Sequence, residues 1–506
     1  MRFVLHNLYG YIILQLSLFY CMELIYDILK KLKKFELRQI RNHLAASPFE
    51  YEKVGKLFEL VTRYKDKDEA FFSQKLYGKD PDNTFRVTKS RLKRMLEDVV
   101  LNDKSLTGYS AKFINAKLQA EKRLLQGEIL LGRGAYKASK NLLHQVISTT
   151  RQFSLHNEHY HAEMLLHRNQ SINKSVREFQ RQTDALLQLN ETNYLVNEAA
   201  ILHYSVTNFL TRLSKSDPET RDEILRKIER IREVSDQTGS PLARYYYLLS
   251  NILFLQYDFQ FEQAMEFCKL HLELVEKEPA VHSKQRLGSA YFQLTETTFR
   301  SGRLEEAQKY VDQTLAFFSP EETNYLIVLG TAFRIAFWSS NWEKAEDFVN
   351  QAMQHPRFEV SEFRAAIWHY YKTCLLFKTE RVRPALRELN NATALLTDKE
   401  GWNLTFRLQE IMILYEAELF DLLETKILNM RQFVKRTQKN SNLYRPMKLI
   451  SILMEWHKNS LNLSQTVKSI QRQLRDLQSY HEDIPFDPAT GELIRLENWM
   501  ADKVGA

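Results

Sequence analysis

The chain has 506 residues, of which 44% are hydrophobic and 26% charged, a composition that excludes wholesale disorder because it can bury a continuous core. Its 14 Gly and 11 Pro make up about 5% of the residues against an ordinary usage of roughly 12%, which excludes a fold with many strands and hairpins. The formal net charge is +8, and residues 30–94 hold 18 Lys and Arg against 9 Asp and Glu, so the basic surplus is confined to one N-terminal segment.

An apolar N-terminal extension covers residues 1–21, and its run 3–21 is about long enough to cross a bilayer. The run is interrupted by His6, Asn7 and Gln15, and its end offers no small residues for signal-peptide cleavage. Three interpretations stay open: a translation start assigned too far upstream, a membrane anchor, and a packed N-terminal helix. We expect a cytoplasmic protein that begins at or near Met22, because residues 24–32 have helical apolar spacing of their own.

Residues 22–103 are predicted to form a small basic helical module. Four apolar stripes at helical spacing lie within residues 37–44, 54–61, 71–76 and 92–99, and a polar loop at 78–83 separates the last two. The last helix would carry three basic residues at i, i+3 and i+7 on a face away from its apolar stripe: Arg86, Lys89 and Lys93. These three are the candidate nucleic-acid contacts of the chain.

From residue 110 to 460 one motif recurs, most clearly as Gly302-Arg303-Leu304-Glu305-Glu306-Ala307, in which a Gly ends one helix and a small residue follows the start of the next. This pattern resembles the tetratricopeptide repeat, in which the small residue lies where two antiparallel helices cross. Residues 127–143 match the pattern equally well, and further crossing positions fall at Ala264, Ala345, Ala385 and, weakly, Leu423. Because these positions are 38 to 43 residues apart rather than 34, we expect an all-α solenoid of degenerate repeats.

Two parts of the chain fit this pattern less well. Between 140 and 260 the number of repeats stays open; we place one weak repeat at Ser175 and a helix start at Pro218. Residues 461–506 have helical spacing, then a loop through Pro485 and Pro488, then a short helix with Trp499. This last segment is expected to cap the final repeat.

The resemblance also implies a binding surface, because the first helix of each tetratricopeptide repeat lines a concave groove. Transferred residue by residue, the groove positions are Tyr246, Gln256, Tyr257, Phe292, Glu296, Arg300, Arg334, Trp338, Tyr370 and Lys378. This mixture of aromatic and basic residues suits an extended or helical peptide with some acidic character. The Lys and Asn pairs of the clamp that holds chaperone tails are missing, which argues against a co-chaperone.

No catalytic or metal site is predicted. The cysteines Cys21, Cys268 and Cys374 lie far apart without paired spacing, and His156, His159, His161 and His167 most simply have structural roles. Phosphate loops, nucleophile elbows and dinucleotide fingerprints are missing from the sequence. We therefore expect no cofactor and a non-enzymatic scaffold that binds a protein or peptide in its groove. The alternative is a tetratricopeptide-type regulator that binds nucleic acid through residues 30–94; a membrane partner is expected only if residues 3–21 insert, and the oligomeric state stays open.

Overall fold

The computed structural model describes residues 22, 24–26, 28–30, 32, 34–46, 48–64, 67–101, 111–170, 175–212, 218–398, 401–437, 444–478 and 491–504. Within these ranges the chain forms helices and no strands, which confirms the predicted all-α class. The chain divides into two compact units, residues 1–107 and residues 108–506, called here the N-terminal and the C-terminal unit. The apolar run 3–21 lies outside the described residues. None of the described helices combines the length and apolarity that a bilayer crossing requires.

In the N-terminal unit the helices α2 (Lys34–Ala46), α3 (Pro48–Arg63), α4 (Glu69–Tyr77) and α5 (Asn83–Leu101) pack around one core. Apolar residues from each helix and from the segment before α2 fill this core, among them Ile25, Ile40, Leu57, Phe58, Phe72, Phe85, Leu92 and Leu96. The hydroxyl of Tyr26 donates to the carbonyls of Tyr64 and Lys67, so the residues just after Met22 are tied to the end of α3. Residues near Met22 therefore belong to this fold.

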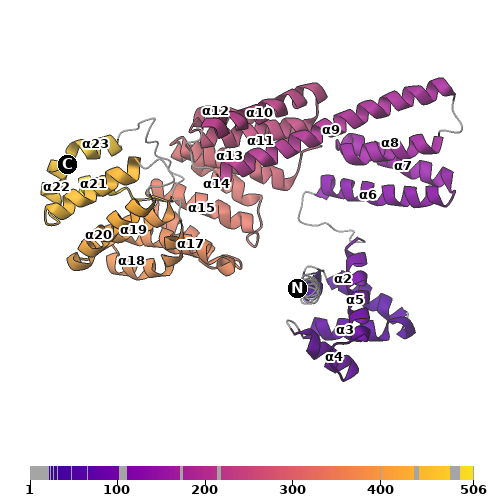
Figure 1. Cartoon of the computed structure of the whole chain (residues 1–506), viewed down its shortest axis with the longest axis horizontal. Coiled ribbons are helices and arrows are strands. Elements are labelled where there is room, and N and C mark those ends of the chain that lie inside the picture. Colours follow the sequence, from indigo (N-terminus) through magenta and orange to yellow (C-terminus); the bar gives the residue numbers. More distant parts are fainter. Residues whose placement is uncertain are drawn as a thin grey trace, which may run out of the picture. The chain divides into compact units, whose positions relative to one another are not determined.

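The C-terminal unit is a succession of helices in which each packs mainly against its neighbours in the chain (Figure 1). The first are α6 (Ala111–Gly132), α7 (Tyr136–Gln152), α8 (His156–Gln170), α9 (Val176–Arg212), α10 (Pro218–Thr238), α11 (Pro241–Tyr257), α12 (Phe261–Lys277), α13 (Lys284–Arg300) and α14 (Leu304–Ala316). There follow α15 (Thr323–Trp338), α16 (Trp342–Met353), η1 (Phe358–Val360), α17 (Glu362–Lys378), α18 (Val382–Leu389), η2 (Asn390–Thr397), α19 (Trp402–Glu416) and α20 (Phe420–Thr437). The last helices are α21 (Tyr444–Lys458), α22 (Leu463–Ser469), α23 (Gln471–Gln478) and α24 (Leu496–Val504).

The second helices α12, α14, α16, α18 and α20 begin at the residues that the repeat pattern predicts. Their crossing residues Ala264, Ala307, Ala345, Ala385 and Leu423 are all fully buried. Because a small side chain lets two helix backbones approach closely, the four alanines explain why these pairs pack tightly. The predicted pairing of antiparallel helices is confirmed.

A left-handed backbone residue stands two positions before the second helix in each of these pairs. Only Gly134 (φ 73°) and Gly302 (φ 82°) supply it with glycine. In the other pairs the position is occupied by Phe259, Ser340, Glu380 and Glu418, and before α22 by Leu461, with φ between 56° and 62°. Side chains other than glycine adopt this conformation at an energetic cost, so the turn geometry is kept even where glycine is absent.

Helix α9 is 37 residues long and takes part in two successive helix pairs. Near its start Phe179 stacks on His167 of α8, whereas Val206, further along, packs in a cluster with residues of α10 and α11. The repeat predicted at Ser175 is wrong, because Ser175 is exposed and caps the start of α9 by exchanging hydrogen bonds with Glu178. The predicted helix start at Pro218 is confirmed by α10.

The last described segment, residues 491–504, packs against α19 and α21. Trp499 of α24 packs against the rings of Tyr415 and Trp456 and donates from Nε1 to Glu416 Oε1 at 3.0 Å. The predicted loop through Pro485 and Pro488 lies outside the described residues. Residues 491–504 therefore pack on the ends of α19 and α21.

Candidate partner-binding surface

The first helices α11, α13 and α15 carry most of the predicted groove residues and are joined to one another side by side. Gln256 Nε2 of α11 donates to Gln293 Oε1 of α13 at 3.1 Å. Arg334 Nη2 of α15 in turn lies 3.3 Å from Glu296 Oε2 of α13. These contacts join the three first helices into one row.

At the α11 end of the row the surface is aromatic and open. Tyr246 is half-buried and stacks on the His203 ring of α9 at 5.2 Å, with the Tyr204 ring 6.3 Å away. Tyr204 is 64% exposed and Ile201, one helical turn before it, is 67% exposed. On α13 the half-buried Phe292 occupies the next groove position. We call the surface formed by Ile201, Tyr204 and Tyr246 the aromatic face.

The sequence interpretation did not find the α9 part of this face. It missed Ile201 and Tyr204 because it placed no first helix between residues 176 and 212. A signal was nevertheless present: Leu187, Tyr194 and Ile201 recur every seven residues along α9, and all three are more than 60% exposed. An apolar stripe at that spacing on one helix face indicates a surface that is not used by the core.

Three of the four predicted basic or acidic groove residues are engaged by the chain itself. The side chains of Glu296 and Arg334 are only 15% and 12% exposed and pair with each other, and Thr331 Oγ1 donates to Glu296 Oε2 at 2.8 Å. Arg300 donates to the backbone carbonyl of Gln256 at 3.0 Å and lies over the Phe261 ring. Among the four, only Lys378 is exposed. These internal contacts weaken the expected preference for an acidic partner.

Tyr370 was predicted to line the groove, and this prediction is wrong. Its side chain is 1% exposed, with its ring 6.0 Å from that of Trp402, and burial raises the pKa of its hydroxyl well above the ordinary value. The cause is the segment 491–504, which the repeat pattern does not contain. The Arg495 guanidinium lies 6.0 Å from the Trp338 ring, and Gly491 lies so close to Trp402 that an added Cβ would come within 2.7 Å of its ring.

A buried charge cluster holds this segment in place. Arg445 of α21 lies 2.6 Å from Glu492 and 3.0 Å from Glu497, and the three side chains are 17%, 12% and 0% exposed. Burial raises the pKa of Glu492, and the Arg445 guanidinium opposes that shift. The row of first helices therefore has an open aromatic part on α9, α11 and α13 and a part on α15, α17 and α19 that the chain itself covers.

In the N-terminal unit the three candidate nucleic-acid contacts do not form one exposed face. Lys89 is 3% exposed and forms an ion pair with Glu69 of α4, so it cannot reach a phosphate and its prediction is wrong. Lys93 lies 3.5 Å from Glu97, and Arg86 is exposed. The three residues do lie on α5, as predicted, but Glu69 of α4 packs against Lys89 and removes it from the surface.

The histidines around α8 have separate local partners. His156 Nε2 lies 3.2 Å from Ser240 Oγ, and His159 Nε2 lies 3.6 Å from Glu163 Oε1. The described part of the chain contains no group of three or more His, Cys, Asp or Glu side chains that could hold a metal ion. Burial raises the pKa of Cys268 and of Cys374 to about 12, so neither thiol is activated as a nucleophile.

Among the solved structures that match this chain are two of low similarity. No protein-family model matches the chain, and no curated protein matches it. Among solved structures, pilF of Pseudomonas aeruginosa aligns with 47% of this chain and 93% of its own, at 14% identity and a TM-score of 0.24. A signal transduction ATPase with numerous domains and a tetratricopeptide-repeat sensor, from Pyrococcus horikoshii, aligns with 72% of this chain and 60% of its own, at 11% identity and a TM-score of 0.37.

Proposed function

We propose that this chain is a non-enzymatic, cytoplasmic scaffold that binds a protein or peptide partner through the aromatic face. The observation that carries the proposal is the exposure of Ile201 and Tyr204 beside Tyr246 in a row of first helices. Exposed aromatic and aliphatic side chains gathered on one surface are typical of protein-binding sites. Helical repeats present such rows because each repeat adds one helix to the same face.

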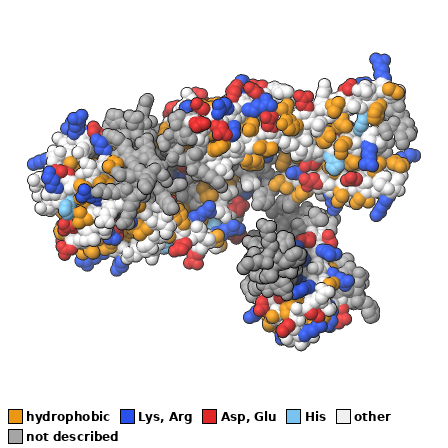
Figure 2. Space-filling view, viewed as in Figure 1, with side chains coloured by type: hydrophobic (Ala, Val, Ile, Leu, Met, Phe, Trp, Pro, Cys, Tyr) orange, Lys and Arg blue, Asp and Glu red, His pale blue; other side chains and the backbone are white. Residues whose placement is uncertain are grey.

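The partner is expected to offer apolar rather than mainly acidic groups. Arg334 and Arg300 are held by Glu296 and by the Gln256 carbonyl, so their charges are largely engaged inside the row. On the face of the C-terminal unit shown in Figure 2, acidic and basic side chains are interspersed, and no wide field of one sign is visible. An amphipathic helix that places its apolar side on Tyr204 and Tyr246 fits this surface.

The test compares partner capture by two charge variants in affinity purification from the native host. Ile201→Glu with Tyr204→Glu puts carboxylates on the aromatic face, and because both side chains are exposed the fold should be kept. Tyr136→Glu is the matched control, since Tyr136 is 59% exposed at the start of α7 and outside the face. We expect the double variant to lose the wild-type partner at least about tenfold and the control to keep it. Equal capture by all three proteins would refute the proposal.

A further inference from the structure

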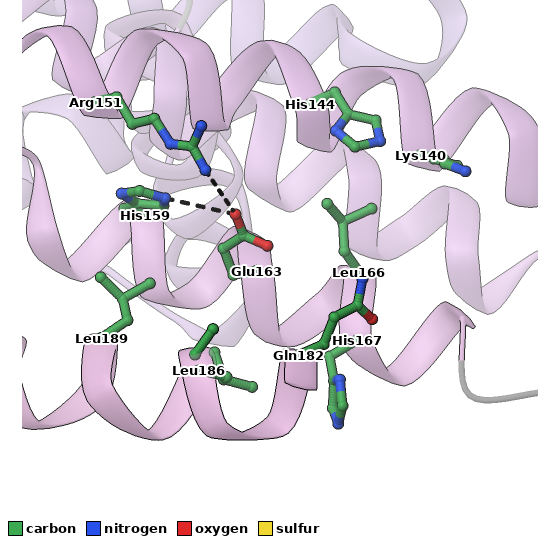
Figure 3. Close-up of a pocket in the computed structure, with 11 residues that line it drawn as sticks. Lys140, His144, Arg151, His159, Glu163, Leu166, His167, Gln182, Leu186 and Leu189 are labelled. Carbon is green, nitrogen blue, oxygen red and sulfur yellow. Dashed lines mark hydrogen bonds and ion pairs between the residues drawn. The ribbon is translucent and has the colours of Figure 1, made fainter. Parts of the chain in front are cut away.

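A pocket separate from the aromatic face opens between α7, α8 and α9 (Figure 3). Its volume is about 510 Å³, within the roughly 300–1,000 Å³ of small-molecule sites. In Figure 3 the side chains of α7 lie along one side of the pocket and those of α9 along the opposite side, with α8 between them. The pocket residues used below are Lys140, His144, Arg151, Glu163, Leu186 and Leu189.

The α7 side of the pocket is positively charged. Lys140, His144 and Arg151 occupy one side of α7, and the only carboxylate among the lining residues is Glu163 of α8. One oxygen of Glu163, Oε1, lies 3.4 Å from Arg151 Nη2 and 3.6 Å from His159 Nε2. The hydrogen bond from His159 lowers the pKa of Glu163, which keeps this group a carboxylate and occupied by its neighbours.

Lys140 and His144 are not used in this way. Both are exposed, and within the described ranges of the chain neither forms a hydrogen bond or a close ion pair, while His144 interacts with Glu163 only through its charge. In Figure 3 Arg151, His144 and Lys140 follow one another along α7, and only Arg151 of these three is joined to Glu163 by a dashed line. The pocket therefore has positive and hydrogen-bonding capacity that the protein does not neutralise, which suits an anionic group.

The opposite side is mainly apolar, with Gln182 as the polar residue among its lining side chains. Leu186 and Leu189 of α9 line it one helical turn apart, and Leu166 of α8 adds to the same wall. The neighbouring His167 is fixed by stacking on Phe179 at 4.2 Å and by a contact of 3.3 Å between its Nε2 and Thr183 Oγ1. The wall between α8 and α9 is therefore formed before any ligand arrives.

We propose that this pocket binds a small organic carboxylate that has an apolar body. The carboxylate would lie against Lys140 and His144, and the apolar body would cover Leu186 and Leu189. A polar wall facing an apolar wall fixes the orientation of such a ligand, since each end has one complementary side. The site does not depend on the aromatic face, because none of its lining residues belongs to it.

The test uses isothermal titration of the full-length protein with octanoate, with octanol as the uncharged analogue and inorganic phosphate as an anion without an apolar body. We expect saturable 1:1 binding of octanoate only. Lys140→Glu with His144→Glu should weaken it at least about tenfold, and Leu186→Ser should weaken it independently of the charges. Lys137→Glu is the matched control, because Lys137 is exposed on α7 and does not line the pocket.

Each other outcome overturns the proposal. Equal binding of octanol would show a purely apolar site, and equal binding of phosphate would show a simple anion site. Octanoate binding that survives the Lys140 and His144 substitutions would place the ligand elsewhere. Circular dichroism of each variant shows whether the helices are kept, and Leu186→Ser provides the second, charge-neutral check if the double variant does not fold.

Discussion

Arg334 of α15 and Glu296 of α13 form an ion pair that joins two successive helix pairs, with 3.3 Å between Nη2 and Oε2 and little exposure of either side chain. Arg334→Met removes one partner and leaves the Glu296 carboxylate shielded from water without its cation. We expect a loss of about 2–4 kcal/mol in the free energy of local opening of α13 and α15, measured by hydrogen exchange. Glu296→Leu with Arg334→Met removes both charges and should recover most of that loss. A single variant as stable as wild type would contradict the assignment.

The crossing alanines provide a second prediction. Ala307, Ala345 and Ala385 have no exposed surface, so Leu at any of them must separate two helices or force its neighbours aside. Each substitution should cost about 1–3 kcal/mol, visible as a lower midpoint of thermal unfolding. Ala316→Leu is the matched control, since this alanine at the end of α14 is exposed. Similar midpoints for the control and the three variants would show that helix contact at these positions is loose.

At the left-handed turn residues, two substitutions should change the free energy of unfolding in opposite directions. Gly302 has φ 82° with nothing within 4 Å of an added Cβ, so Gly302→Ala should destabilise by about 1 kcal/mol through backbone conformation alone. Glu380 holds φ 60° without being glycine, so Glu380→Gly should stabilise by up to about 1 kcal/mol. Denaturant unfolding of both variants measures the difference, and a stabilising effect of Gly302→Ala would be incompatible with this turn geometry.

Two buried histidines predict a loss of stability in mild acid. Burial lowers the pKa of His203 and of His271 to about 4, and neither ring nitrogen of His271 has a hydrogen-bond partner in the described structure. In the unfolded chain a histidine pKa is about 6.5. The free energy of unfolding is therefore unaffected by the protonation of these two rings above pH 6.5 and decreases as the pH falls from 6.5 towards 4, because only the unfolded chain takes up protons in that range.

Between pH 7 and pH 5 each histidine should lower the free energy of unfolding by about 2 kcal/mol, because the unfolded chain is protonated at a higher pH than the folded protein. His271→Phe keeps an aromatic ring of similar size but cannot be protonated. Its urea unfolding should therefore depend less steeply on pH between 7 and 5 than that of the wild type. Parallel pH profiles of the two proteins would rule out this contribution.

The local repeat pattern was sufficient to predict the helix pairs from α11 to α20, but not those around α9. Phe261, Leu304, Trp342, Val382 and Phe420 begin second helices as expected, since a crossing residue and a turn are encoded within a few positions. The left-handed turns were not visible in the sequence, because most of them use residues other than glycine. Packing rather than propensity keeps these turns in place.

The candidate site was predictable only in part. The predictions for Tyr370 and Lys89 were wrong because their burial depends on residues distant in sequence. Tyr370 is covered by a segment more than 100 residues downstream, and Lys89 meets a carboxylate 20 residues upstream. Helical spacing places such residues on a face but does not say what packs against that face. Tyr246, by contrast, is next to Tyr204 because α9 and α11 are neighbours in the solenoid.

Because α9 runs without interruption through two helix pairs, few insertions or deletions within it are compatible with the fold. A turn between helices can absorb an added residue by rearranging locally. One extra residue within the 37 residues of α9, however, would rotate everything on one side of it by about 100° relative to the other and shift it by about 1.5 Å. Insertions or deletions of a single residue in α9 should therefore be selected against. Those of seven residues, close to two full turns, should be tolerated best.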